Sequence, residues 1–68
     1  MKVWIARNED GDLMLFENKP YYHDIYGFWY DVFEMPIADD LNSTLFPEVT
    51  FENSPQEIEL KLITNEKQ

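Results

Sequence analysis

The stretch from Gly27 to Met35 constrains the fold most, because it is the densest apolar run in the chain. Six of its nine side chains are large and apolar or aromatic, and Pro36 follows directly. Aromatic and β-branched side chains favour strands, since their bulk fits a pleated, half-buried surface. The apolar side chains fall on both alternating faces. A strand that is apolar on both faces is usually covered on both, so the sequence predicts a central strand over residues 28–35.

Alternating hydrophobicity and turn residues predict four further strands, at residues 2–8, 13–17, 48–52 and 57–63. Asp10-Gly11 lies between the first two and predicts a tight hairpin, because glycine readily adopts a positive φ. The last strand has the clearest alternation. It predicts Leu60 in the core and its neighbour Glu59 facing water.

These segments predict a mainly β protein with a small antiparallel sheet of about five strands. Residues 1–68 are expected to form a single domain with a frayed tail from about residue 64. Residues 21–26 are expected to form a connection, and one short helical turn is expected near residues 42–45. The first three strands are apolar on both faces. Either the sheet curls into a small half-open barrel, or it is flat and its second face docks a partner.

Length and cysteine content indicate how such a domain is stabilised and where it resides. The chain has 68 residues and no cysteine. Small domains often need disulfides or a metal, so the 11 aromatic residues (five Phe, four Tyr and two Trp) are expected to stabilise this one instead. The absence of cysteine favours a reducing, cytoplasmic setting. No stretch resembles a signal peptide or a membrane span, so a soluble protein is expected.

Charge is distributed unevenly along the chain. The sequence has 14 acidic and 5 basic residues, for a net charge of −9. No Lys or Arg lies between Pro20 and Leu60, whereas nine acidic residues do. This pattern disfavours direct binding to nucleic acids or anionic membranes, which requires clustered cations. Pairing the first and last strands would gather Lys2, Arg7 and Lys61 at one edge and leave the opposite side acidic.

An acidic side of this kind fits a protein partner with a basic surface, as in a nucleic-acid mimic. Simple solubility explains the same charge and is the favoured interpretation. The candidate partner-binding residues are four acids and three aromatic residues: Asp31, Glu34, Asp39, Asp40, Trp29, Tyr21 and Tyr22.

The sequence predicts no catalytic, cofactor-binding or metal site. His23-Asp24 could orient an imidazole, but no nucleophile motif accompanies the pair, and a local structural bond is the better interpretation. Residues 8–12 faintly resemble a calcium loop, but the glycine and the final ligand are misplaced, and a hairpin turn explains them. The tyrosines around Trp29 could stack on bases or sugars. That stretch lacks the cations of such sites, so packing at the core edge is favoured.

Two passages together resemble a known group of proteins. The first is Trp4-Ile5-Ala6-Arg7-x-x-Asp10-Gly11-x-Leu13-x-Leu15-Phe16-x-x-Lys19-Pro20, and the second is Ser43-x-Leu45-Phe46-Pro47-Glu48-Val49-x-Phe51-Glu52-x-x-Pro55-x-Glu57. Together they resemble small uncharacterised proteins of gut Bacteroidetes and their phages or mobile elements. The resemblance implies an intracellular bacterial or phage setting and assigns no activity to any residue.

The leading functional hypothesis is a non-enzymatic protein-interaction module, such as an accessory or inhibitory protein of a phage or mobile element. The alternative is a self-associating structural protein that forms a homodimer through an apolar sheet face. An enzyme is the least favoured class.

Overall fold

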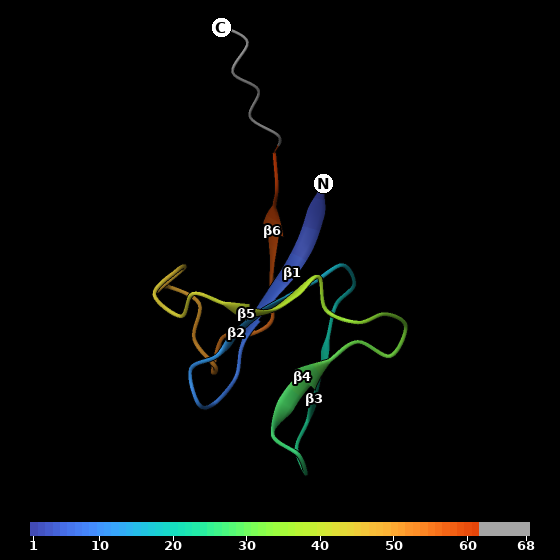
Figure 1. Ribbon diagram of the computed structural model, residues 1–68, viewed down its shortest axis with the longest axis vertical. Coiled ribbons are helices and arrows are strands. Elements are labelled where there is room, and N and C mark those ends of the chain that lie inside the picture. Colours follow the sequence, from blue (N-terminus) through green and yellow to red (C-terminus); the bar gives the residue numbers. More distant parts are fainter. Residues whose placement is uncertain (62–68) are drawn as a thin grey trace, which may run out of the picture.

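The computed structural model describes residues 1–61 and shows a mainly β protein, with no helix among these residues. The six strands are β1 (Lys2–Arg7), β2 (Leu13–Phe16), β3 (Tyr21–His23), β4 (Phe28–Tyr30), β5 (Ala38–Leu41) and β6 (Gln56–Glu59). Four of them form an open antiparallel sheet in the order β5-β2-β1-β6. The other two form a separate β3–β4 hairpin, which lies to one side of the sheet (Figure 1).

The β1–β2 hairpin forms the centre of the sheet, and its turn is the one expected from Asp10-Gly11. Gly11 has a φ of 100°, in the left-handed region that glycine adopts without strain. The Asn8 N–H donates to the Asp12 carbonyl (2.7 Å), and the Asp12 N–H donates to the Asp10 carboxylate (3.0 Å). These turn bonds account for the polar residues between the strands.

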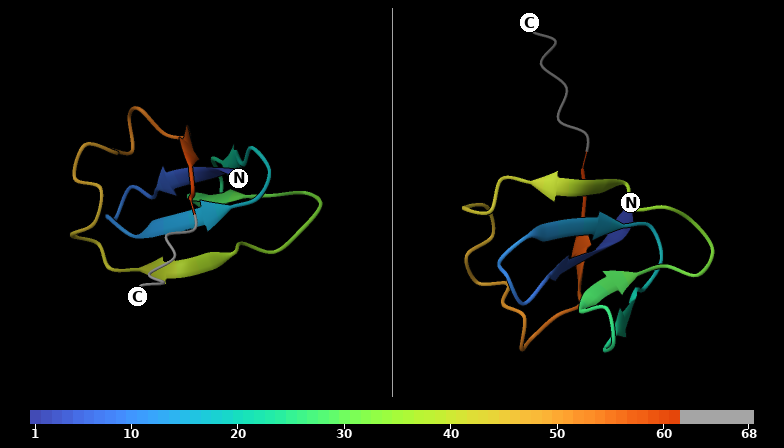
Figure 2. Two further views of the ribbon diagram at one scale, coloured as in Figure 1. Left: turned by 90° about the horizontal axis from the view of Figure 1, so that it is seen from above. Right: turned by 60° about the horizontal axis from the view of Figure 1, so that its bottom comes forward.

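Both faces of the β1–β2 hairpin are apolar, and the chain itself covers both. On one face a buried cluster joins Ala6, Met14 and Phe16 to Trp29 of β4. On the other face Ile5 and Leu13 pack with Val49, which belongs to the loop of residues 42–55. The β3–β4 hairpin and most of this loop extend from the sheet in different directions (Figures 1 and 2), although Phe51 of the loop reaches Tyr22 of the hairpin. The two-sided hydrophobicity of the first strands therefore reflects a sheet between two segments of its own chain.

The predicted central strand over residues 28–35 is wrong. Only Phe28–Tyr30 is extended, and it lies outside the main sheet. The strand ends at Tyr30, before Asp31, whose carboxylate accepts a hydrogen bond from the Phe33 N–H (2.8 Å). Such a local side-chain bond stabilises a turn in competition with strand pairing.

The predicted strand over residues 48–52 is also wrong, for the same physical reason. The Thr50 N–H donates to Asn53 Oδ1 (2.8 Å), and the Asn53 N–H donates to Thr50 Oγ1 (3.2 Å). Asn53 Nδ2 also donates to the Glu48 carbonyl (2.9 Å). Local side-chain bonds thus replace a strand ladder. Val49 faces inward as predicted, with 3% of its surface exposed.

Two segments outside the predicted strands are extended, one of them within the connection expected at residues 21–26. Residues 38–41 form edge strand β5, and residues 21–23 form β3. The helical turn expected at residues 42–45 is a plain turn. There the Asn42 carbonyl accepts from the Leu45 N–H (3.0 Å), and Asn42 Oδ1 accepts from the Thr44 N–H (2.9 Å).

The first and last strands pair, but β1 lies between β2 and β6 with Lys2 and Arg7 at its two ends, and Leu60 is not in the core. Val3 lies opposite Ile58, and Lys2 lies opposite Glu59. Leu60 follows the end of β6, beside the start of β1, where little remains to cover it, and 39% of its surface is exposed. Glu59 is exposed as predicted. The rest of the predicted strand and the predicted frayed tail lie outside the described residues.

Candidate functional site

The β3–β4 hairpin has an inner face that is firmly held. Tyr22 and Trp29 point toward the sheet, with ring centroids 5.2 Å apart, and Phe51 packs edge-on against Tyr22 at 5.1 Å. Trp29 Nε1 donates to the Arg7 carbonyl (3.0 Å), and the Trp29 N–H donates to Asn8 Oδ1 (3.3 Å). These contacts fix the hairpin against the end of β1.

The outer face of the same hairpin carries a second aromatic cluster that faces away from the core. His23 stacks on Phe28 with centroids 5.8 Å apart, and Tyr26 lies 4.6 Å from His23. Tyr21 and Tyr30 complete the cluster at 6.5 Å from each other. His23 Nδ1 accepts a hydrogen bond from the Tyr26 N–H (3.2 Å), a local bond of the kind that the sequence favoured for this histidine.

A groove of about 380 Å³ lies between β4 and the loop that follows it. Its volume is within the range of about 300–1,000 Å³ that is typical of ligand pockets. Two of its lining residues, Met14 and Trp29, belong to the core. Four others are exposed apolar side chains: Phe28, Val32, Phe33 and Met35. We name residues 21–37, which comprise the hairpin and this loop, the aromatic lobe.

Carboxylates accompany the apolar lining of the groove. Asp31 and Glu34 are lining residues. The pKa of Glu34 is raised by a hydrogen-bonding contact with Glu17, by the charge of Glu17, by partial desolvation and by the charge of Asp31. The pKa of Asp31 is lowered, chiefly by the Phe33 N–H and also by Asn18 Nδ2, which donates to its carboxylate (3.0 Å). Like charges are therefore crowded beside the groove.

The basic groups near the core are engaged elsewhere. Arg7 uses all five guanidinium N–H groups on backbone carbonyls, those of Gly11, Ser43, Leu45, Phe46 and Val49, at 2.6–3.1 Å. Lys19 Nζ lies 5.7 Å from the centre of the Trp4 ring. Within residues 1–61 the only salt bridge joins the N-terminal ammonium to Glu59 (2.8 Å). In that part of the chain, no cation forms a salt bridge with the carboxylates of the groove.

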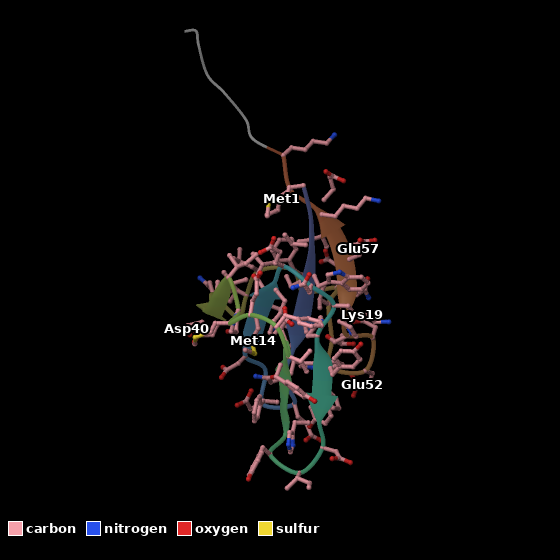
Figure 3. All side chains as sticks on the ribbon, turned by 90° about the vertical axis from the view of Figure 1, so that its right-hand side faces the viewer. Met1, Met14, Lys19, Asp40, Glu52 and Glu57 are labelled. Atoms are coloured by element: carbon pink, nitrogen blue, oxygen red, sulfur yellow. The ribbon has the colours of Figure 1, made fainter. Side chains whose placement is uncertain are left out.

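The structure brings together some of the predicted site residues and separates others. Trp29, Asp31 and Glu34 all line the groove. Tyr21 is on the outer face of the hairpin, and Tyr22 is half-buried on the inner face. Asp39 and Asp40 lie outside the groove on edge strand β5; Figure 3 shows Asp40 on the opposite side of the molecule from Lys19.

Sequence reasoning missed the groove because it assigned the apolar side chains of Phe28, Val32, Phe33 and Met35 to a doubly covered strand. The available signal was Asp31, a residue that is depleted in strands and common in turns. A turn at this position, followed by Pro36, predicts a loop that presents its apolar side chains at the surface. Glu17, on the segment after β2, was missed because only the fold brings it to Glu34.

The described residues contain no group of three or more His, Asp or Glu side chains arranged to hold a metal ion. They also contain no helix of the length and apolarity that a membrane crossing requires. What the groove offers chemically is apolar contact area next to negative charge. Comparison with protein-family models, curated proteins and solved structures finds no match for this chain.

Proposed function

We propose that this protein is a non-enzymatic protein-interaction module that binds its partner through the aromatic lobe. The supporting observation is where exposed apolar surface gathers. Among the described residues, 12 large apolar side chains are exposed. Eight of them belong to the aromatic lobe: Tyr21, Ile25, Tyr26, Phe28, Val32, Phe33, Met35 and Ile37.

Exposed apolar side chains are ordinary when they are scattered, but a contiguous patch of them marks an interaction site. Removing apolar surface from water is worth roughly 25 cal/mol per Å². Aromatic residues that become fully desolvated contribute most to protein interfaces. Phe33 and Met35 leave 81% and 83% of their surface exposed, so a partner could desolvate both.

The biological setting belongs to the same proposal and rests on the sequence. The lack of cysteine and the resemblance to proteins of Bacteroidetes phages and mobile elements support a cytoplasmic accessory or inhibitory role. Self-association is the competing prediction. The homodimer was expected to form through an apolar sheet face. The apolar faces of the β1–β2 hairpin, however, are covered by other segments of the same chain.

Affinity capture from a lysate of the native host tests the proposal when it is performed with matched variants. We expect the double variant Phe33→Ser/Met35→Ser to lose the partners that the wild type captures. Its stability should change by less than about 0.5 kcal/mol, because both side chains are largely exposed. Leu45→Ser is the control, since Leu45 is an exposed apolar residue of the loop opposite. Partners that the double variant still captures, but that Leu45→Ser no longer captures, would contradict the proposal.

A further inference from the structure

We propose that the groove beside β4 binds a peptide segment of the partner that carries an apolar anchor side chain flanked by Lys or Arg. The inference rests on the proposed protein-interaction function and specifies the chemistry of the partner. It follows from two properties of the groove, namely its apolar lining and the negative charge beside it.

The lining suits an apolar anchor. Met14 and Trp29 are held in place by the core, so one side of the groove is preorganised. Trp29 is fixed further by its hydrogen bonds to Arg7 and Asn8. A rigid aromatic surface at the base of a small groove loses little conformational freedom on binding, which favours affinity. A single large side chain that enters such a groove is the usual anchor of a peptide interface.

The charge beside the groove suits cations next to that anchor. Asp31 and Glu34 line the groove, and the negative charges of Glu17 and Asp31 both act on the Glu34 carboxylate. Arg7 is fully engaged by carbonyls, and Lys19 lies over Trp4. A Lys or Arg from the partner would relieve this like-charge repulsion, and an Arg would also stack on the exposed aromatic rings.

The same charge argues against a second copy of this chain as the occupant. A symmetric dimer centred on the groove would place the three carboxylates of one copy against the same three of the other. Like charges that face each other across an interface oppose association. Each copy also carries a net charge of −9.

A displayed library of random 12-residue peptides, selected on the full-length protein, tests the inference. We expect the selected sequences to share one aromatic or aliphatic residue with Lys or Arg within a few positions. A synthetic peptide of that consensus should bind at least about tenfold more weakly above roughly 0.5 M salt, where exposed charges are screened. Backbone amide NMR shifts caused by this peptide should centre on residues 28–35.

Matched variants assign the cationic contacts to the groove. We expect Glu17→Gln/Glu34→Gln to weaken binding of the consensus peptide about tenfold, mainly through slower association. This variant removes like-charge repulsion, so its weaker binding would not result from unfolding. The control is Asp39→Asn/Asp40→Asn, which removes two exposed charges on β5 outside the groove and should change binding less than about twofold.

The possible outcomes separate this inference from the proposed function. A selected consensus that is apolar without basic residues, and insensitive to salt, would overturn the inference and leave the interaction module intact. Equal weakening by both double variants would also overturn it, because the charge effect would not belong to the groove. No enrichment of any peptide, together with a dimeric mass in sedimentation that Phe33→Ser/Met35→Ser abolishes, would overturn both in favour of self-association.

Discussion

The loop of residues 42–55 and the aromatic lobe cover opposite faces of the same sheet by different means. The loop contains no regular secondary structure, yet many of its backbone groups have hydrogen-bond partners, including four carbonyls that accept from Arg7. The aromatic lobe contains a regular hairpin, yet it leaves eight large apolar side chains exposed. Regularity of the backbone and completeness of packing are therefore independent properties in this protein.

The difference indicates which region serves the fold and which is free to bind. In the loop, Phe46 adopts a φ of 51°, a conformation that costs a non-glycine residue energy. Its carbonyl accepts from Arg7 and from the Val49 N–H, and these bonds offset that cost. In the aromatic lobe only the inner side chains are committed to the fold. The exposed ones do little for the stability of the isolated chain.

The largest expected effect is that of Arg7→Ala, which removes the anchor of the loop. Hydrogen bonds to charged groups contribute about 1.5–3 kcal/mol each when buried, and less at the surface. We expect a loss of about 3 kcal/mol in the free energy of unfolding, measured by urea denaturation. Lys2→Ala, at the other end of β1, is the control and should cost less than about 0.5 kcal/mol. Equal losses would show that the loop does not depend on its anchor.

A smaller effect is expected from Asn53→Ala. The Asn53 side chain accepts from the Thr50 N–H and donates to the Glu48 carbonyl, so the variant leaves two backbone groups without these partners. We expect a loss of about 1–2 kcal/mol, because these groups are partly accessible to water. Asn18→Ala, which removes one exposed hydrogen bond to Asp31 in the other half of the molecule, should cost less. Hydrogen exchange at Thr50 would report the local opening.

The smallest effect is expected from Glu34→Gln in the aromatic lobe. This variant should raise the stability at pH 7, whereas the two preceding variants lower it. The pKa of Glu34 is raised above its ordinary value of 4.5, so between that value and the raised pKa the folded state holds more protons than the unfolded state. Stability therefore falls as the pH rises through this window. We expect Glu34→Gln to raise the urea midpoint at pH 7 and to leave it unchanged at pH 3.5. A lower midpoint at pH 7 would show that the carboxylate supports the fold.

The alternation of apolar and polar residues predicted strands correctly where the backbone is regularly extended. It failed where side chains form hydrogen bonds to nearby backbone groups. The β1–β2 hairpin follows from Asp10-Gly11 and two apolar runs, and the antiparallel β class follows from the short alternating segments. Asp31 and Asn53 ended or prevented the strands predicted around them, because their side chains bond nearby backbone groups. The candidate site was predicted in part: Trp29, Asp31 and Glu34 were chosen for aromaticity and charge, whereas Glu17 requires the fold.

The Arg7 network also has a consequence for the order in which the chain folds. Four of the carbonyls that it binds lie 36 to 42 residues away along the sequence. Bringing segments so distant together costs more chain entropy than closing the short turn between β1 and β2. We therefore expect the local hairpin to form first and to place the guanidinium at its turn end before the loop joins it. A contact that forms after the rate-limiting step acts mainly on the rate of unfolding, so we expect Arg7→Ala to speed unfolding more than it slows folding.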